Sequence, residues 1–269
     1  FLLLWCLQEA RVFMACSKKL VGDCTMLKVN NLSKSFGALQ VTQGVSFHLN
    51  KGARHALVGP NGAGKTTLFN ILSGELAPDS GRIIFEGTDI TSYNRWRRVR
   101  AGISRSFQGS NLFLESSVLE NIILALLACR SPATNVLKKL NSEKALKEKA
   151  VVIATKVGLK DRLAEKVEDL AYGSQRQLEV ALVLALSPKV MLLDEPTAGM
   201  SLVEKKEMLS IIESLSTNLS ILIIEHDMDV VFHVSNWVTV LDDGRILFEG
   251  TPEDARKSDE VRSRYLSEV

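Results

Sequence analysis

The residues from Gly59 to Thr67 have the types and spacing needed to hold a polyphosphate. They fit the phosphate-loop pattern G-x-x-x-x-G-K-[ST] and read Gly59, Pro60, Asn61, Gly62, Ala63, Gly64, Lys65, Thr66 and Thr67. The glycines allow a tight turn in which successive backbone N–H groups point into one concavity. Lys65 adds a positive charge for the β- and γ-phosphates, and the Thr66 hydroxyl can be a ligand of Mg²⁺. The stretch therefore predicts a nucleotide site.

The flanks of this loop support the prediction. Residues 55–58 are typical of a buried strand that runs into the loop, and residues 67–72 of a helix that ends at Gly74. The N-terminus of that helix then faces the phosphates. The bare pattern arises by chance in roughly one chain in a hundred of this length, but a strand before it and a helix after it favour nucleotide binding.

Two other predicted strands end in residues that can do chemistry. A strand over 190–193 is followed by Asp194 and Glu195, and a strand over 221–224 leads to His226. Ligands of open α/β sheets bind at the carboxyl ends of the strands. Asp194 can hold the hydration shell of Mg²⁺, Glu195 can accept a proton from an attacking water, and His226 can contact the γ-phosphate. Each signal is weak alone, since acidic turns and structural histidines are common, but with the phosphate loop the set is strong.

Phe36 and Gln108 are further candidates. Phe36 precedes Gly37 in the first predicted loop, where an exposed ring can stack on a nucleobase, although ordinary packing explains it equally well. Gln108 follows a Ser-Phe pair and can be a ligand of Mg²⁺ or of the attacking water. Residue composition alone does not single it out.

Length and composition bound the other possibilities. The chain has 269 residues, with 33 basic and 31 acidic side chains, a balance that argues against a surface for duplex nucleic acid. Between residues 90 and 105 arginines accompany Trp96, and a solvated helix explains them better than nucleic-acid binding, because nothing else supports the latter. Apolar runs such as 122–129 are far shorter than the ~18 residues of a spanning helix. Three of four cysteines lie in the first 24 residues, which indicates no disulfide framework.

The predicted elements indicate an α/β fold. Strands and helices alternate, and several strands are continuously apolar, as in a parallel sheet covered on both faces. Ser201 and Glu204 form a capping box that opens one helix, and Asp243-Gly244 is a hairpin turn. The regular pattern begins at Met26, so we expect residues 1–25 to be an extraneous or disordered segment outside a folded domain of residues 26–269.

Taken in order, these motifs resemble those of the ATP-binding subunits of ABC transporters, over residues 26–269. Phe36 resembles the family's adenine-stacking aromatic, Gln108 its Q-loop and His226 its switch histidine. Residues 190–195 resemble its second nucleotide motif. The resemblance implies a phosphate-loop NTPase with a RecA-like parallel sheet core, a small antiparallel β subdomain and an inserted α-helical subdomain at about 109–175. It implies ATP hydrolysis with Mg²⁺ and a catalytic set of Glu195, His226 and Gln108.

The family's signature motif, which contacts the ATP of a partner subunit, is matched by Leu170 and the four residues Ala171, Tyr172, Gly173 and Ser174. Its usual second residue, Ser, is Ala171, and its usual last residue, Gln, is Ser174. Residues 198–201 resemble the D-loop, in which Ser201 replaces the usual Asp. The resemblance implies that the N–H of Gly173 and the N-terminus of the following helix face the partner's phosphate.

Several segments are similar to the branched-chain amino-acid importers within the family: Tyr172-Gly173, 195–200, 225–231 and 249–252. This similarity implies a head-to-tail pair with a second ATP-binding subunit, two transmembrane permease subunits and a periplasmic solute-binding protein. It places the chain peripherally at the cytoplasmic face of the inner membrane, powering uptake of branched-chain or hydrophobic amino acids. No nucleic-acid partner is expected.

Other functions remain open. The same architecture serves urea, amide or lipopolysaccharide transport. Soluble ABC ATPases act on nucleic acid or the ribosome, but usually carry tandem ATPase halves or long insertions that this chain lacks. A phosphate-loop kinase needs a second-substrate site and a lid, and leaves the signature unexplained.

Overall fold

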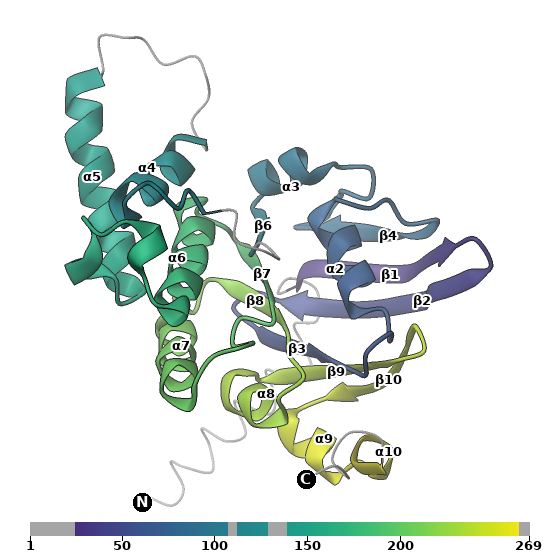
Figure 1. The fold of residues 1–269 in the computed structure, drawn as a ribbon. Helices are drawn as coiled ribbons and strands as arrows, with labels where there is room; N and C mark the ends of the chain where they lie inside the picture. The colour runs from purple at the N-terminus through teal and green to yellow at the C-terminus, as the bar shows by residue number, and fades with distance from the viewer. Residues whose placement is uncertain (1–24, 107–111, 129–138, 264–269) are drawn as a thin grey trace, which may run out of the picture.

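The computed structural model describes residues 25–106, 112–128 and 139–263 (Figure 1). Gln108 and the segment 1–24 lie outside the described residues, so the predictions made for them stay predictions. The described chain forms two β-sheets and a set of helices that fill and cover the space around them. No helix among the described residues combines the length and the apolar character that a membrane span requires.

A four-stranded antiparallel sheet opens the described chain, with the strand order β2-β1-β4-β5. Its strands are β1 (Thr25–Phe36), β2 (Leu39–Asn50), β4 (Ser80–Phe85) and β5 (Thr88–Asp89). β1 begins at Thr25, one residue before the predicted start. It also ends at Phe36, so this residue is the last of a strand and not part of a loop as predicted, because β1 and β2 pair up to Phe36 and Leu39.

A six-stranded sheet carries the predicted chemistry, with the order β10-β9-β3-β8-β7-β6. Its strands are β3 (Arg54–Val58), β6 (Ile103–Arg105), β7 (Val190–Asp194), β8 (Ser220–Ile224), β9 (Trp237–Asp242) and β10 (Arg245–Gly250). The pairs from β9 through β6 are parallel, and only β10 is antiparallel, joined to β9 by the predicted hairpin. β7 and β8 are buried along their whole length, as continuous apolar sequences predict.

Helices lie on both faces of this sheet. They are α2 (Lys65–Ser73), α3 (Arg95–Ala101), α4 (Val118–Ala128), α5 (Lys139–Lys156), α6 (Tyr172–Ala185), α7 (Leu202–Ser214), α8 (Met228–Val234), α9 (Pro252–Lys257) and α10 (Asp259–Val261), with short 3₁₀ helices at Lys160–Arg162 and Val167–Asp169. One core packs α2 between the two sheets, and another packs α4–α7 against the opposite face of the six-stranded sheet. Figure 1 shows this second group of helices on the left.

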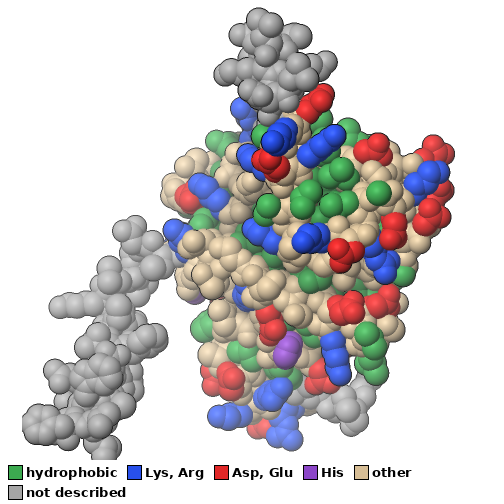
Figure 2. Space-filling view, turned by 90° about the vertical axis from the view of Figure 1, so that its left-hand side faces the viewer, with side chains coloured by type: hydrophobic (Ala, Val, Ile, Leu, Met, Phe, Trp, Pro, Cys, Tyr) green, Lys and Arg blue, Asp and Glu red, His purple; other side chains and the backbone are tan. Residues whose placement is uncertain are grey.

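The helices that lie between β6 and β7 in the sequence are all on this left-hand side. α4, α5 and the two 3₁₀ helices come between β6 and β7 in the sequence, and α6 packs against both α4 and α5. The outer surface of this side mixes hydrophobic and charged side chains (Figure 2). Large hydrophobic side chains exposed on α4 and α5 are Leu124, Leu127 and Val152. The predicted bounds of a helical subdomain, about 109–175, stay a prediction.

Candidate active site

Four parallel strands bring the predicted site residues to one edge of the six-stranded sheet. β3 leads into the phosphate loop, β7 ends at Asp194, β8 is followed by Glu225 and His226, and β6 ends at Arg105. Because these strands are parallel neighbours, their carboxyl ends lie together. Sequence positions more than a hundred residues apart thus form one site.

The phosphate loop needs two of its glycines for close packing as well as for the turn. Gly59 has φ 155° and Gly64 has φ 96°. A Cβ at Gly59 would lie 2.3 Å from the carbonyl oxygen of Leu241, and one at Gly64 would lie 2.5 Å from that of Val41. Strands β9 and β2 therefore hold the loop from two sides, and no side chain fits between.

Lys65 lies folded across the loop. Its Nζ donates hydrogen bonds to the carbonyl oxygens of Gly59 at 2.6 Å and Pro60 at 2.9 Å. Burial lowers the pKa of Lys65, and the nearby carboxylates of Glu195 and Asp194 act in the opposite direction. The ammonium therefore lies over the concavity of the loop, where a polyphosphate oxygen can replace a carbonyl partner.

Asp194 forms a buried ion pair with Arg105, which sequence reasoning did not single out. The Arg105 guanidinium donates from Nη2 to Asp194 Oδ2 at 2.7 Å, and from Nη1 to Asn70 Oδ1 of α2 at 2.5 Å. Asp194 is 7% exposed. Burial raises its pKa, and Arg105 acts against that rise. The end of β6, the helix after the phosphate loop and the acid at the end of β7 are thus joined by one side chain.

Glu195 and His226 lie next to each other and face solvent. Glu195 Oε1 is 3.7 Å from His226 Nδ1, and their side chains are 42% and 64% exposed. Glu195 has φ 46°, a left-handed conformation that is unusual for a residue with a Cβ. Its N–H donates to the carbonyl oxygen of Ile224 at 2.9 Å, which fixes it against the end of β8. Both side chains are therefore free to meet a ligand above the loop.

The signature segment contacts the D-loop segment of its own chain. The Tyr172 hydroxyl donates to the carbonyl oxygen of Ala198 at 3.2 Å and accepts from Arg176 Nε at 2.9 Å. Ala171 is the N-cap residue of α6 and supplies no side-chain hydrogen bond to the helix. Tyr172 is 45% exposed, so the segment still offers a surface to other molecules.

The Gly173 N–H, which is expected to face the partner's phosphate, is hydrogen-bonded within its own chain. In this structure it donates to Glu204 Oε1 at 3.0 Å, while Oε2 of the same carboxylate accepts from the backbone N and the hydroxyl of Ser201. The predicted capping box of Ser201 and Glu204 is confirmed. Glu204 thus caps two helices at once, its own and α6, whose N-cap alanine cannot do so.

Phe36 is 51% exposed at the end of β1, so it is not packed into the core. The Lys34 Nζ lies 5.8 Å from the centre of its ring. A ring in this state is available for stacking. Stacking of this ring on a nucleobase stays a prediction.

Comparison with known protein families matches residues 42–198 to the ABC transporter family. The chain belongs to this family. It is the ATP-binding subunit of an ABC transporter, and the family's cassettes hydrolyse ATP. This confirms the resemblance drawn from the motifs, and the α/β phosphate-loop fold is confirmed with it.

Relatives of this ABC ATPase match nearly the whole chain. One relative is the high-affinity branched-chain amino acid transport ATP-binding protein BraF of Pseudomonas aeruginosa. This chain is 35% identical to it over 253 residues, which cover 91% of this chain and 98% of the relative. The chain is 36% identical, with the same coverage, to the transport ATP-binding protein LivG of Salmonella typhimurium.

Solved structures agree with the fold. The ADP conformation of an ATP-binding cassette of an ABC transporter matches with a TM-score of 0.79 and 30% identity, covering 91% of this chain and 99% of that one. A subunit called cbiO1, from Clostridium perfringens, matches with a TM-score of 0.77 and 26% identity, covering 92% and 96%.

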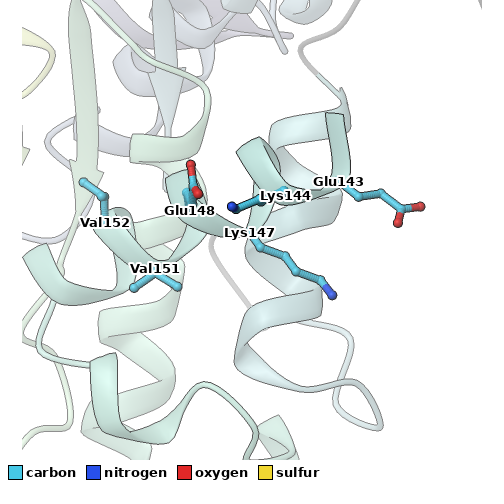
Figure 3. A pocket seen from close by; sticks show the side chains of 6 residues that line it. All are labelled: Glu143, Lys144, Lys147, Glu148, Val151 and Val152. Atoms are coloured by element: carbon cyan, nitrogen blue, oxygen red, sulfur yellow. The ribbon is translucent and has the colours of Figure 1, made fainter. Parts of the chain in front are cut away.

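A hollow of about 660 Å³ lies away from the motifs of this ATPase (Figure 3). The described residues that line it all belong to α5: Glu143, Lys144, Lys147, Glu148, Val151 and Val152. Figure 3 shows Glu143 and Lys147 pointing outward from the helix. Of the predicted site residues that the structure describes, none lines this hollow.

Proposed function

We propose that this ABC ATPase powers the uptake of branched-chain or other hydrophobic amino acids. The observation that carries the proposal is the identity of 35–36%, over 91% of the chain, to transport ATP-binding proteins named for branched-chain amino acids. Because other subunits bind the solute, its assignment rests on the similarity of the whole ATPase to these relatives and not on a solute site in this chain.

In this proposal the phosphate loop holds ATP and the adjoining strand ends hydrolyse it. Lys65 leaves its carbonyl partners to neutralise the β- and γ-phosphates. Glu195 accepts a proton from the attacking water, and His226, 3.7 Å from it, contacts the γ-phosphate. The exposed ring of Phe36 stacks on the adenine. Gln108, which lies outside the described residues, completes the set as a ligand of the metal or of the water.

The residues at the site fit a magnesium ion. Thr66 is exposed at the start of α2 and offers a hydroxyl oxygen, and Asp194 offers a carboxylate at the end of β7. Hydroxyl and carboxylate oxygens, together with phosphate oxygens, are the ligands that Mg²⁺ prefers. The ion would neutralise charge on the β- and γ-phosphates during hydrolysis.

Two ATP-binding subunits would close head to tail, with each ATP between one phosphate loop and the partner's signature. Exposed residues beside the signature support such a surface: Leu202 is 78% exposed, Val203 68% and Tyr172 45%. The hydrophobic side chains on the outer face of α4 and α5 would contact two permease subunits (Figure 2). A periplasmic solute-binding protein would deliver the solute, and the subunit would lie at the cytoplasmic face of the inner membrane.

Uptake of labelled leucine in cells that lack the gene tests this proposal. Uptake should fall to background and return with the wild-type gene, but not with Lys65→Ala, while Lys257→Ala at the exposed end of α9, away from the proposed permease surface, should restore it fully. Tagged protein should copurify with two membrane subunits. Leucine uptake that is unchanged in the deletion strain, with loss of urea or amide uptake instead, would contradict the solute assignment.

A further inference from the structure

Glu225 is a buried carboxyl group at the edge of the sheet that carries the ATPase motifs, and the reaction proposed above does not use it. It directly follows β8 and directly precedes His226, and it is fully buried. Burial raises its pKa, and hydrogen bonds from Thr197 act against the rise. A buried carboxyl group carries a desolvation cost, so its contacts need a reason.

Both hydrogen bonds to Glu225 come from one residue. Its Oε1 accepts from the Thr197 hydroxyl at 2.8 Å and from the Thr197 backbone N–H at 3.2 Å. Thr197 is 1% exposed, so water does not compete for either bond. Oε2 is buried too, with no partner among the described residues. The carboxyl group thus ties the end of β8 to the turn that follows β7.

That turn begins at Glu195, whose φ of 46° is left-handed. A residue with a Cβ rarely adopts this conformation, which persists only where the surroundings fix it. Two backbone hydrogen bonds help: Glu195 N–H to Ile224 O at 2.9 Å and Ala198 N–H to Glu195 O at 3.1 Å. The pair of bonds between Thr197 and Glu225 closes the turn from its other side.

We propose that Glu225 is a positioning residue for ATP hydrolysis, which holds the turn carrying Glu195 against the strand end carrying His226. The two side chains come from different strands, and their 3.7 Å separation depends on how those strand ends meet. Glu225 directly precedes His226 in the sequence. Its carboxyl group is hydrogen-bonded to Thr197, which lies two residues after Glu195. The inference rests on the proposed roles of Glu195 and His226.

Substitutions at both ends of the link test this in the full chain. Glu225→Gln keeps the shape and one acceptor oxygen, so kcat should stay within about threefold of wild type. Glu225→Ala removes the acceptor, and kcat should fall about tenfold, which corresponds to about 1.4 kcal/mol, with KM for ATP within twofold. Thr197→Ser should behave as wild type and Thr197→Val should lower kcat at least threefold. The last pair decides the question if Glu225→Ala does not fold.

Two controls distinguish a positioning role of Glu225 from a general loss of stability and from a failure of the role proposed for Glu195. Val261→Ala opens a cavity at a buried site in α10, outside the motifs, and should lower the melting temperature without changing kcat. Wild-type kcat in Glu225→Ala, or equal losses in the Gln and Ala variants, overturns the positioning role. Wild-type turnover in Glu195→Gln would instead remove Glu195 as the base, whatever Glu225 does.

Discussion

Replacing Ala171 by Ser should stabilise the protein through the first turn of α6. Ala171 occupies the N-cap position with φ −58° and ψ 152°, an extended conformation that N-cap serines adopt, and offers no side-chain acceptor. The Gly173 N–H is already bound by Glu204. A serine hydroxyl would therefore accept from the next backbone N–H, that of Ser174. Ser and Ala at an N-cap differ by about 1 kcal/mol, within a range of about 0.5–2.

Thermal and urea unfolding measure this effect. A gain of about 1 kcal/mol raises the melting temperature by about 2–4 °C in a domain of this size. The matched control is Ala145→Ser on the exposed surface of α5, where serine in a helix interior should destabilise by a few tenths of a kcal/mol. An unchanged melting temperature in Ala171→Ser, or an equal gain in the control, would refute the capping argument.

Glu204 makes the prediction sharper. With Glu204→Ala, the Gly173 N–H loses its acceptor, and a serine at 171 can take it instead. The gain from Ala171→Ser should therefore be larger in the Glu204→Ala background than in wild type, a coupling that a double-mutant cycle reports. Equal gains in both backgrounds would mean that the two side chains do not share this N–H group.

Three further results are expected. Burial lowers the pKa of His55 to about 3, so the fold holds it neutral; its stabilisation is present above the unfolded pKa of about 6.5 and is lost as the pH falls. Between pH 7 and pH 5, the free energy of unfolding measured with urea should fall by about 2 kcal/mol more in wild type than in His55→Gln. Equal falls in the two proteins would contradict this. Arg105→Met leaves Asp194 buried without its cation and should lower the free energy of unfolding by about 3 kcal/mol at pH 7. Most of this loss should be recovered in the double variant with Asp194→Asn, whereas additive losses would argue against the ion pair. A chain that starts at Thr25 should melt within a few degrees of the full chain, and loss of cooperative unfolding would show that residues 1–24 belong to the fold.

Local sequence signals predicted the parts of the site that lie within one strand and the loop after it. The phosphate loop between β3 and α2 is recognisable because its glycines, Lys65 and flanking apolar run are contiguous. The capping box of Ser201 and Glu204 spans four residues for the same reason. The apolar runs of β7 and β8 indicate a buried parallel sheet. Because ligands of such sheets bind at the carboxyl ends of the strands, the residues that follow these runs are predicted to lie at the site.

Contacts between strand ends could not be predicted in this way. Arg105 meets Asp194 only because β6 and β7 are neighbours, and Glu225 meets Thr197 only because β8 lies beside β7. Strand order is a property of the whole fold, and no local pattern records it. The sequence favoured a solvated helix over residues 90–105, whereas Arg105 ends strand β6 and its side chain is 7% exposed. Phe36 was placed in a loop because Gly37 follows it, whereas pairing with β2 extends the strand to that residue.

ATP binding and hydrolysis by Glu195→Gln test most sharply whether Glu195 is the general base. The amide keeps the shape of the side chain and cannot accept the proton, and loss of a general base typically lowers the rate by about 10²–10⁴. For Glu195→Gln we expect an ATP dissociation constant within about twofold of wild type and a kcat at least about a hundredfold lower, while Glu207→Gln on the exposed face of α7 leaves both unchanged. Turnover at the wild-type rate in Glu195→Gln would contradict the central claim that this strand end hydrolyses ATP.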